Sequence, residues 1–251
     1  MKSLTPSPTL ITKAYEAILE AICVGRLPAA ARLNQDELAA RLQISRQPVG
    51  QALTILKSQG FVRDTGRRGL IVAPLEVDFF LAIYQLREAL DPLAARLAAD
   101  RHAEPDLAAA RKLVAEGRKA VATGVIDALI DTDLRFHMWI YRTAGNPLLV
   151  DTMGLYWNHL RRAMGEVLRE PKGRPQVWDE HEKILRAIAA RDGEAAEKHA
   201  GRHAREAARR VVGSLAQAAL TAKLVGKQGE GEAPPRRRGL RQRTARAEGA
   251  R

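Results

Sequence analysis

The sequence has little cysteine and few aromatic residues. Its 251 residues include one cysteine, Cys23, which excludes a disulfide framework and a zinc ribbon built on cysteine ligands. Aromatic residues make up 4% of the chain, whereas hydrophobic residues together make up 46%. Alanine and leucine therefore fill most of the interior, and this composition favours helices over strands.

The sequence also lacks an apolar run that approaches the roughly 18 residues of a membrane span. Its start, Met1-Lys2-Ser3 followed by Pro6 and Pro8, has no hydrophobic core of the kind that secretory signals carry. We therefore expect a cytoplasmic protein that makes no contact with a membrane.

Acidic residues are outnumbered by basic ones, 29 against 41, and the resulting net charge of +12 favours a polyanionic partner. The charge is concentrated at the two ends of the chain. Residues 1–75 hold 10 basic and 5 acidic groups and residues 226–251 hold 8 and 3, whereas residues 76–225 are nearly neutral with 23 and 21.

Three segments follow from charge and periodicity: a basic N-terminal domain at 8–74, an all-helical domain at 78–222 and a basic tail at 223–251. Leu240 is the only large apolar residue from residue 226 onward, so the tail cannot bury enough surface to offset its chain entropy. We expect the tail to be disordered. It is either an arm that binds DNA without sequence preference or a solvated segment of little consequence.

The first segment predicts a helix over 10–25 and then two short helices joined by a tight turn. Asn34 with Glu37 three positions later forms a capping-box pattern that opens the first short helix. Ser45 is expected to cap the second, which has Pro48 in its first turn and ends at Gly60.

Residues 61–63 and 70–72 alternate like the two strands of a hairpin, around a glycine-bracketed basic tip. Two capped helices followed by a basic hairpin describe a winged helix-turn-helix, whose second helix enters the major groove of DNA by its N-terminal end. The predicted DNA contacts are Asn34, Ser45, Arg46, Gln47, Gln51, Arg67, Arg68 and Gly69. The alternative is a small helical domain with an ordinary basic loop.

From Leu75 onward the apolar residues recur at helical spacing almost throughout, which predicts an antiparallel bundle with an interior that can hold a ligand. Pro92 should kink or split the first helix. The predicted helices are 78–100, 105–122, 126–144, 147–169, 176–191 and 193–222.

Histidines and one aspartate gather in the second half of this segment. Asp133 and His137 are four residues apart and so project from one face of one helix. His181 lies on a later helix, and His199 and His203, again four residues apart, lie on the last. Three imidazoles and one carboxylate suit a borderline divalent ion, with zinc first and nickel or manganese as alternatives. On spacing alone, solvated histidines on polar helix faces are the competing interpretation.

Residues 33–49, which read LNQDELAARLQISRQPV, resemble the DNA-binding domain of GntR-family transcription regulators, as does the end of the wing at 67–72. This resemblance covers roughly residues 10–73. One departure concerns the recognition helix, where the family continues with Val-Arg-Glu-Ala-Leu and this chain with Val-Gly-Gln-Ala-Leu. Gly50 thus replaces an arginine that contacts DNA in the family, which implies a shifted operator or weak binding.

Residues 79–215 resemble the FCD ligand domain of the FadR subclass of that family. Asp133, His137, His181 and His203 match its metal ligands. The resemblance further implies a small organic acid as effector, with Arg87 at the position of the arginine that neutralises it. Asn146, in a turn similar to the family's mid-domain turn, is the second predicted effector contact. The alternative for Arg87 is an i,i+4 salt bridge with Asp91 on a solvated face.

The sequence therefore predicts a mainly α protein, with a winged helix-turn-helix and its β-hairpin followed by an all-α, FCD-like bundle. The function that it indicates is ligand-responsive transcription regulation, as a repressor that binds a palindromic operator of double-stranded DNA as a homodimer. Enzymatic activity is not expected. The alternatives are an architectural DNA binder without metal or effector, and a metal-dependent hydrolase, against which no second catalytic motif is found.

Overall fold

The computed structural model describes residues 9–66, 69–101, 106–168 and 174–229. The chain divides into one compact unit that ends at Ala216 and another that begins at Gln217. Within the described stretches, no helix has the length and apolarity that a membrane crossing requires. The predicted tail from residue 230 onward lies outside the described residues.

The N-terminal part is built on three helices, α1 (Leu10–Cys23), α2 (Gln35–Leu42) and α3 (Arg46–Ser58). Asn34 caps α2 as predicted, because its side-chain oxygen accepts hydrogen bonds from the backbone N–H groups of Asp36 and Glu37 at 2.9 and 3.5 Å. The turn between α2 and α3 depends on Gln43, which has a left-handed backbone with φ of +56°.

The predicted cap of α3 is wrong in one detail. Ser45 stands at the N-cap position with extended backbone angles, but its side chain makes no capping hydrogen bond. An N-cap side chain usually bonds the N–H of the second or third helical residue, and the third residue here is Pro48, which has no N–H. Ser45 is exposed, so its hydroxyl stays available to a partner.

Three short strands form an antiparallel sheet in the order β1-β3-β2, with β1 at Arg32–Leu33, β2 at Val62–Asp64 and β3 at Leu70–Val72. The hairpin of β2 and β3 confirms the predicted wing, although β2 begins one residue later than predicted, and pairs Val62 with Val72. The sequence did not reveal β1, since two residues are too few to show an alternating pattern.

One hydrophobic core lies under this sheet and the three helices. Its largest fully buried side chains are Ile18, Ile22, Leu53, Leu56 and Phe61. The periodic apolar positions of the predicted helices thus face one another. The polar N-terminal residues of α3 consequently point outward.

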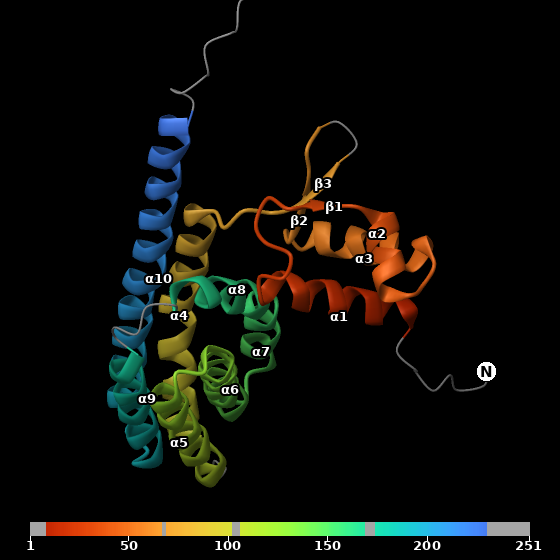
Figure 1. The fold of residues 1–251 in the computed structure, drawn as a ribbon. Helices are drawn as coiled ribbons and strands as arrows, with labels where there is room; N and C mark the ends of the chain where they lie inside the picture. The colour runs from red at the N-terminus through yellow and green to blue at the C-terminus, as the bar shows by residue number, and fades with distance from the viewer. Residues whose placement is uncertain (1–8, 67–68, 102–105, 169–173, 230–251) are drawn as a thin grey trace, which may run out of the picture. The chain divides into compact units, whose positions relative to one another are not determined.

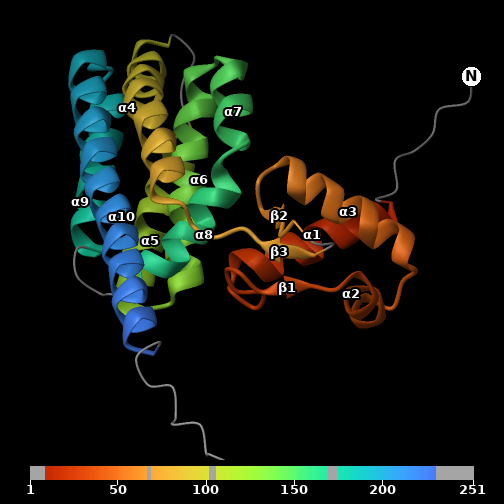
Figure 2. The same cartoon turned by 90° about the horizontal axis from the view of Figure 1, so that it is seen from above.

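Seven further helices follow. They are α4 (Val77–Asp100), α5 (Leu107–Thr123), α6 (Ile126–Ala144), α7 (Pro147–Gly154), α8 (Trp157–Val167), α9 (Arg174–Ala189) and α10 (Gly193–Gly229). Contacts join α4, α5, α6 and α9 side by side, as Figures 1 and 2 show. A second hydrophobic core, separate from that of the N-terminal part, fills the space between these helices.

Two predicted helices need correction. The single helix predicted at 147–169 is two, α7 and α8, separated at Leu155 and Tyr156, because the apolar spacing runs on through the break and hides it. The last helix continues seven residues beyond its predicted end, to Gly229.

Pro92 does not split α4, which is continuous from Val77 to Asp100. Asp91, Ala94 and Ala95 on either side of the proline are buried in the bundle, so tertiary packing outweighs the lost hydrogen bond. The proline ring lies against α10 at Gly201, where an added Cβ would stand 3.3 Å from the ring.

A glycine in α5 determines how closely α5 approaches α9. A Cβ built on Gly117 would lie 2.1 Å from the indole ring of Trp178, which is 2% exposed. No side chain fits there unless the indole moves. Trp178 in turn contacts the ring of His181 edge-on at 4.8 Å, so this close packing supports the histidine described below.

We predict that Gly117→Ala lowers the free energy of unfolding by about 1–3 kcal/mol, because the methyl group overpacks the core against Trp178. The matched control is Gly213→Ala in α10, where nothing lies within 4 Å of the added Cβ. This change should raise stability by up to about 1 kcal/mol through helix propensity. Urea unfolding at one fixed protein concentration measures both, and equal effects would contradict the packing argument.

Candidate metal centre

Three histidines from three helices converge inside the bundle. His137 of α6, His181 of α9 and His203 of α10 are each at most 2% exposed. The Nε2 atom of His203 lies 3.4 Å from Nε2 of His181 and 3.3 Å from Nε2 of His137. One ligand atom from each ring can therefore reach a common point, and all of these atoms lie within 4.8 Å of one another.

These separations fit a metal ion. With Zn–N bonds of about 2.0–2.1 Å and tetrahedral angles, two nitrogen ligands stand roughly 3.3–3.4 Å apart. The two Nε2–Nε2 distances agree with this spacing. Solvated histidines on polar faces, the competing interpretation of the sequence pattern, are excluded by the burial of all three rings.

Asp133 stands at the side of this histidine cluster, one turn before His137 on α6. Its carboxylate oxygens lie 3.5 Å from Nε2 of His181 and 4.0 Å from Nε2 of His137. Burial raises the pKa of Asp133, and the nearby His203 and Arg87 act in the opposite direction. The structure thus brings all four predicted ligands together, with the carboxylate slightly farther out than the rings.

The orientation of His203 is set by a neighbouring acid. Nδ1 of His203 lies 2.8 Å from Oε2 of Glu180, and Arg210 donates to the same carboxylate at 3.0 and 3.3 Å. Although burial opposes it, the hydrogen bonds from His203 and Arg210 lower the pKa of Glu180. An ionised Glu180 places the proton of His203 on Nδ1, which leaves the Nε2 lone pair directed at the cluster.

The other two rings are kept neutral. Burial lowers the pKa of His137 and that of His181 well below the usual value, and the positive charge of Arg87 adds to the effect. A neutral imidazole is the form that binds a metal. Nδ1 of His181 is buried and has no hydrogen-bond partner among the described residues.

Arg87 lies in the wall of the cluster. Its Nη2 atom is 3.1 Å from Nε2 of His137, and it donates to Oδ2 of Asp91 from Nη2 at 2.8 Å and from Nε at 3.1 Å. Tyr141 donates its hydroxyl proton to the other oxygen of Asp91. Despite burial, Asp91 raises the pKa of Arg87, so the guanidinium stays charged.

The i,i+4 pair of Arg87 and Asp91 therefore exists, but not on the solvated face that the alternative interpretation assumed. The two side chains are 3% and 4% exposed. The gap beside them, lined by residues that include Asp91, His137, Tyr141 and His203, has no room for a water molecule. Anything larger than an ion can enter only if a wall moves.

Asn146, the second predicted effector contact, caps α7. Its side-chain oxygen accepts a hydrogen bond from the N–H of Leu148 at 3.1 Å. A contact between Asn146 and an effector stays a prediction.

The predicted DNA-contacting side chains of α3 stand together on one exposed face. Ser45, Arg46, Gln47 and Gln51 are exposed, whereas Pro48 between them is buried. Nε of Arg46 lies 2.7 Å from a carboxylate oxygen of Asp36 on α2. This pair is more than 60% exposed on both sides, so it is weak and leaves Arg46 free to exchange partners.

Gly50 gives room to a side chain from the preceding helix. Gln35 donates to the carbonyl oxygen of Arg46 at 2.6 Å, and a Cβ on Gly50 would lie 2.7 Å from the donating nitrogen. The residue that departs from the family pattern thus lets Gln35 hold the first turn of α3.

The tip of the wing is described only in part. Arg67 and Arg68 lie outside the described residues. Gly69 accepts a hydrogen bond from the N–H of Thr65 at 2.9 Å across the tip. Asn34 uses its side-chain oxygen to cap α2, as described above.

Sequence reasoning missed the residues that orient the cluster. Glu180 and Arg210 hold His203, and Asp91 with Tyr141 holds Arg87. The sequence did offer Asp91 as the i,i+4 partner of Arg87, but neither the burial of the pair nor the hydrogen bond from Tyr141 could be read from it. Tyr141 is i+4 from His137, a spacing that also places it on the inner face of α6. Glu180 is adjacent in sequence to His181, and no helical spacing shows that it reaches α10.

Two protein families match the chain. The description "Bacterial regulatory proteins, gntR family" matches residues 10–72, and "FCD domain" matches residues 82–206. The first match covers the helices and strands of the N-terminal part, and the second covers the four residues of the candidate centre.

Several relatives are named as regulators of operons. A probable D-xylose utilization operon transcriptional repressor of Paenarthrobacter nicotinovorans is 30% identical over 205 residues, 78% of this chain and 85% of the relative. The Galactonate operon transcriptional repressor of Escherichia coli is 26% identical over 65% of this chain and 80% of its own. The Nta operon transcriptional regulator of Aminobacter aminovorans is 32% identical over 124 residues, 49% of this chain and 58% of that relative.

Solved structures have the same fold. E. coli McbR/YncC has a TM-score of 0.70 at 21% identity, over 83% of this chain and 98% of that one. A transcriptional regulator GntR from Rhodococcus sp. RHA1, described as putative, has the same TM-score and identity over 81% and 97%. These similarities support the mainly α architecture that the sequence predicted.

We predict that Asp91→Asn lowers the free energy of unfolding by about 3–5 kcal/mol, because it leaves the charge of Arg87 buried without its counter-ion. The control is Asp131→Asn, which breaks the exposed i,i+4 pair with Arg135 on α6 and should cost less than about 1 kcal/mol. Chemical denaturation followed by circular dichroism compares the two. A small loss for Asp91→Asn would mean that Arg87 finds another partner.

Proposed function

The chain belongs to the GntR family of bacterial regulatory proteins and carries an FCD domain, and from this premise we propose that it is a ligand-responsive repressor of transcription. In this proposal residues 8–74 bind DNA, residues 78–222 bind a metal ion and a small organic acid, and residues 223–251 form a basic tail. The observation that carries the proposal is the convergence of three buried imidazole nitrogens at 3.3–3.4 Å in the second of these domains.

Operator recognition is assigned to the exposed N-terminal end of α3. Arg46 and Gln47 have donors of the length that reaches base edges in the major groove, and Ser45 suits a phosphate. On binding DNA, Arg46 exchanges Asp36 for a base or a phosphate. Because Gly50 supplies no side chain, Arg46 provides the arginine contact of this helix by itself, together with whatever the wing adds.

The metal is assigned to Asp133, His137, His181 and His203. Three neutral imidazoles and one carboxylate are a donor set suited to zinc, with nickel and manganese as alternatives. When bound, such an ion supplies a Lewis acid that attracts a carboxylate. The protein contributes the neutral rings, the oriented Nε2 atom of His203 and a dry environment.

The effector is assigned to the same interior, beside Arg87. Asp91 already occupies two donors of Arg87, so an incoming carboxylate must either share the guanidinium or displace Asp91. We infer that the ion supplies the main attraction and that Arg87 sets the orientation of the acid. Binding of the acid then shifts the balance between a conformation that binds DNA and one that does not.

A homodimer follows from the mode of DNA reading. Two recognition helices that read a palindrome require a two-fold axis. The relatives named as operon repressors support the proposal that this chain is a repressor of transcription.

The metal assignment predicts that His137→Ala loses most of its bound zinc, because the cluster loses one of its three nitrogen ligands. Elemental analysis of protein equilibrated with zinc and then desalted measures this. The control is His199→Ala, a half-buried histidine one turn before His203 on α10, which should keep the wild-type content. Full zinc content in His137→Ala would refute the assignment.

The DNA assignment predicts that Arg46→Ala weakens specific binding roughly tenfold or more, since a good arginine–guanine pair contributes 1–3 kcal/mol of discrimination. Deleting 226–251 should weaken binding much less. Fluorescence anisotropy on the DNA upstream of the protein's own gene, against a scrambled duplex at two salt concentrations, measures both effects.

Preference for the upstream DNA that survives the higher salt supports base reading. Equal binding to both duplexes that collapses with salt would mean phosphate contacts alone, and would favour an architectural DNA binder. Release of the zinc-loaded protein from DNA by acetate, succinate or citrate would support an organic acid effector.

A further inference from the structure

Helix α8 begins at the candidate metal centre. The ring of Trp157, its first residue, lies 6.0 Å from the ring of His137 and 5.8 Å from that of Tyr141. The guanidinium carbon of Arg87 stands 6.0 Å over the same indole. The indole nitrogen is buried and has no hydrogen-bond partner among the described residues, so no hydrogen bond fixes this side chain.

Two residues later, α8 contacts the C-terminal end of the recognition helix. Nε2 of His159 lies 2.9 Å from the carbonyl oxygen of Gln59, the C-cap residue of α3. The imidazole stacks on the ring of Phe61 at 3.9 Å, with 6° between the planes. Phe61 is 2% exposed in the N-terminal core, so His159 contacts both the helix that reads DNA and the core beneath it.

The next turn of α8 contacts two other segments of the N-terminal part. Arg161 donates two hydrogen bonds to the carboxylate of Glu20 on α1, one of them at 3.0 Å. Arg162 donates to the carbonyl oxygen of Ala73, in the linker that follows β3. Within six residues, α8 therefore contacts the cluster at one end and three segments of the DNA-binding part at the other.

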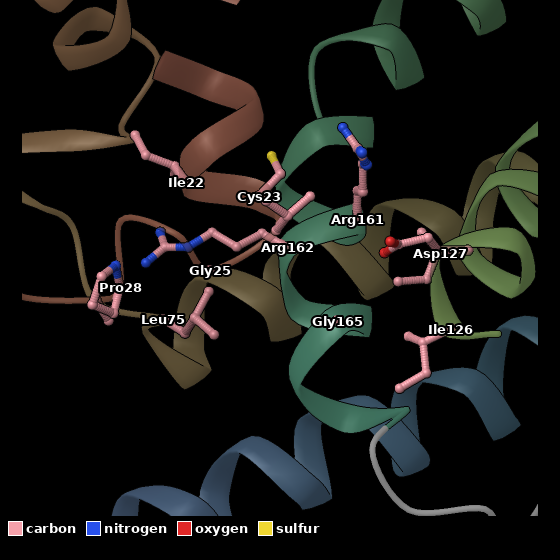
Figure 3. Close-up of a pocket in the computed structure, with 13 residues that line it drawn as sticks. Ile22, Cys23, Gly25, Pro28, Leu75, Ile126, Asp127, Arg161, Arg162 and Gly165 are labelled. Atoms are coloured by element: carbon pink, nitrogen blue, oxygen red, sulfur yellow. The ribbon is translucent and has the colours of Figure 1, made fainter. Parts of the chain in front are cut away.

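The packing beside these contacts is incomplete. A cavity of about 260 Å³ separates α8 and the start of α6 from the end of α1, and its lining includes Ile22, Cys23, Asp127, Arg161 and Arg162 (Figure 3). Polar contacts beside an open cavity can rearrange at lower cost than a close-packed apolar contact. The polar contacts between α8 and the N-terminal part can therefore rearrange at low cost.

We propose that α8 transmits occupancy of the histidine cluster to the recognition helix, with Trp157 as the residue that senses the cluster and His159 as the residue that positions α3. This inference rests on the proposed metal centre, and it adds the route by which the centre acts on DNA binding.

The first step of the route is a competition at His137. Its Nε2 lone pair faces Nη2 of Arg87 at 3.1 Å, and one lone pair cannot serve both a hydrogen bond and a metal ion. With an ion held by His137, Arg87 would lose this contact while keeping Asp91, and its guanidinium, which lies over Trp157, would shift. Trp157 and His159 are rigidly connected by the first turn of α8, so a displaced indole moves the imidazole that holds Gln59.

The test is hydrogen exchange measured by mass spectrometry on the full-length protein, with and without zinc as the probe. In the wild type, zinc should change amide exchange both in the bundle and in the segment 57–64, which contains Gln59 and Phe61. In His159→Ala the change in 57–64 should be lost while the change in the bundle remains. His159→Gln, which restores an N–H donor, should recover part of the response.

Trp157→Phe tests the other end of the route. It should also abolish the response of segment 57–64, and the double variant with His159→Ala should behave like either single variant, because the two residues act in series. Arg135→Ala, which removes a cation that pairs with Glu116 and Asp131 within the bundle, is the control and should keep the response.

Zinc uptake, checked by elemental analysis, distinguishes a failure of the metal centre from a failure of the route through α8. Protein that binds zinc and changes exchange only in the bundle would overturn the role of α8 and leave the metal centre standing. A response in 57–64 that persists in both His159→Ala and Trp157→Phe would overturn it as well. Wild-type protein that takes up no zinc would overturn the metal centre, and this inference with it.

Discussion

The burial of three imidazole rings is the constraint on which the bundle depends. A polar nitrogen removed from water must find a partner, or it costs about 1–3 kcal/mol. Here Nε2 of His203 lies 3.4 Å from Nε2 of His181 and 3.3 Å from Nε2 of His137, and Glu180 holds its Nδ1 atom, whereas Nδ1 of His181 has no partner among the described residues. Helices α6, α9 and α10 are thereby held at one point, and the gap beside the rings has no room for a water molecule.

Charge inside the bundle is balanced locally. Arg87 has Asp91 and Arg210 has Glu180, so each cation near the cluster stands beside its own carboxylate. Burial lowers the pKa of His137 and that of His181 and so favours their neutral form, and the charge of Arg87 acts in the same direction. The metal site that we propose therefore depends on lone pairs rather than on net charge.

The DNA-binding part shows how a departure from a family pattern is accommodated. Gly50 removes a side chain from α3, and Gln35 uses the vacated space to hold the carbonyl of Arg46. The start of the recognition helix is fixed from α2 and its C-terminal end by α8. Both ends of α3 are therefore held by side chains from other helices.

The sequence by itself determined the helical composition and the winged helix-turn-helix, because helical periodicity and capping patterns are local properties. The set Asp133, His137, His181 and His203 came from the resemblance to the FCD domain, since only Asp133 and His137 are joined by an i,i+4 spacing. The sequence did not determine that Arg87 and Asp91 are buried, that Glu180 reaches His203, that α8 is separate from α7, or that His159 holds Gln59. Those features depend on which helix faces which, and only the packing of the whole bundle decides that, since no local pattern records a contact between residues a hundred positions apart.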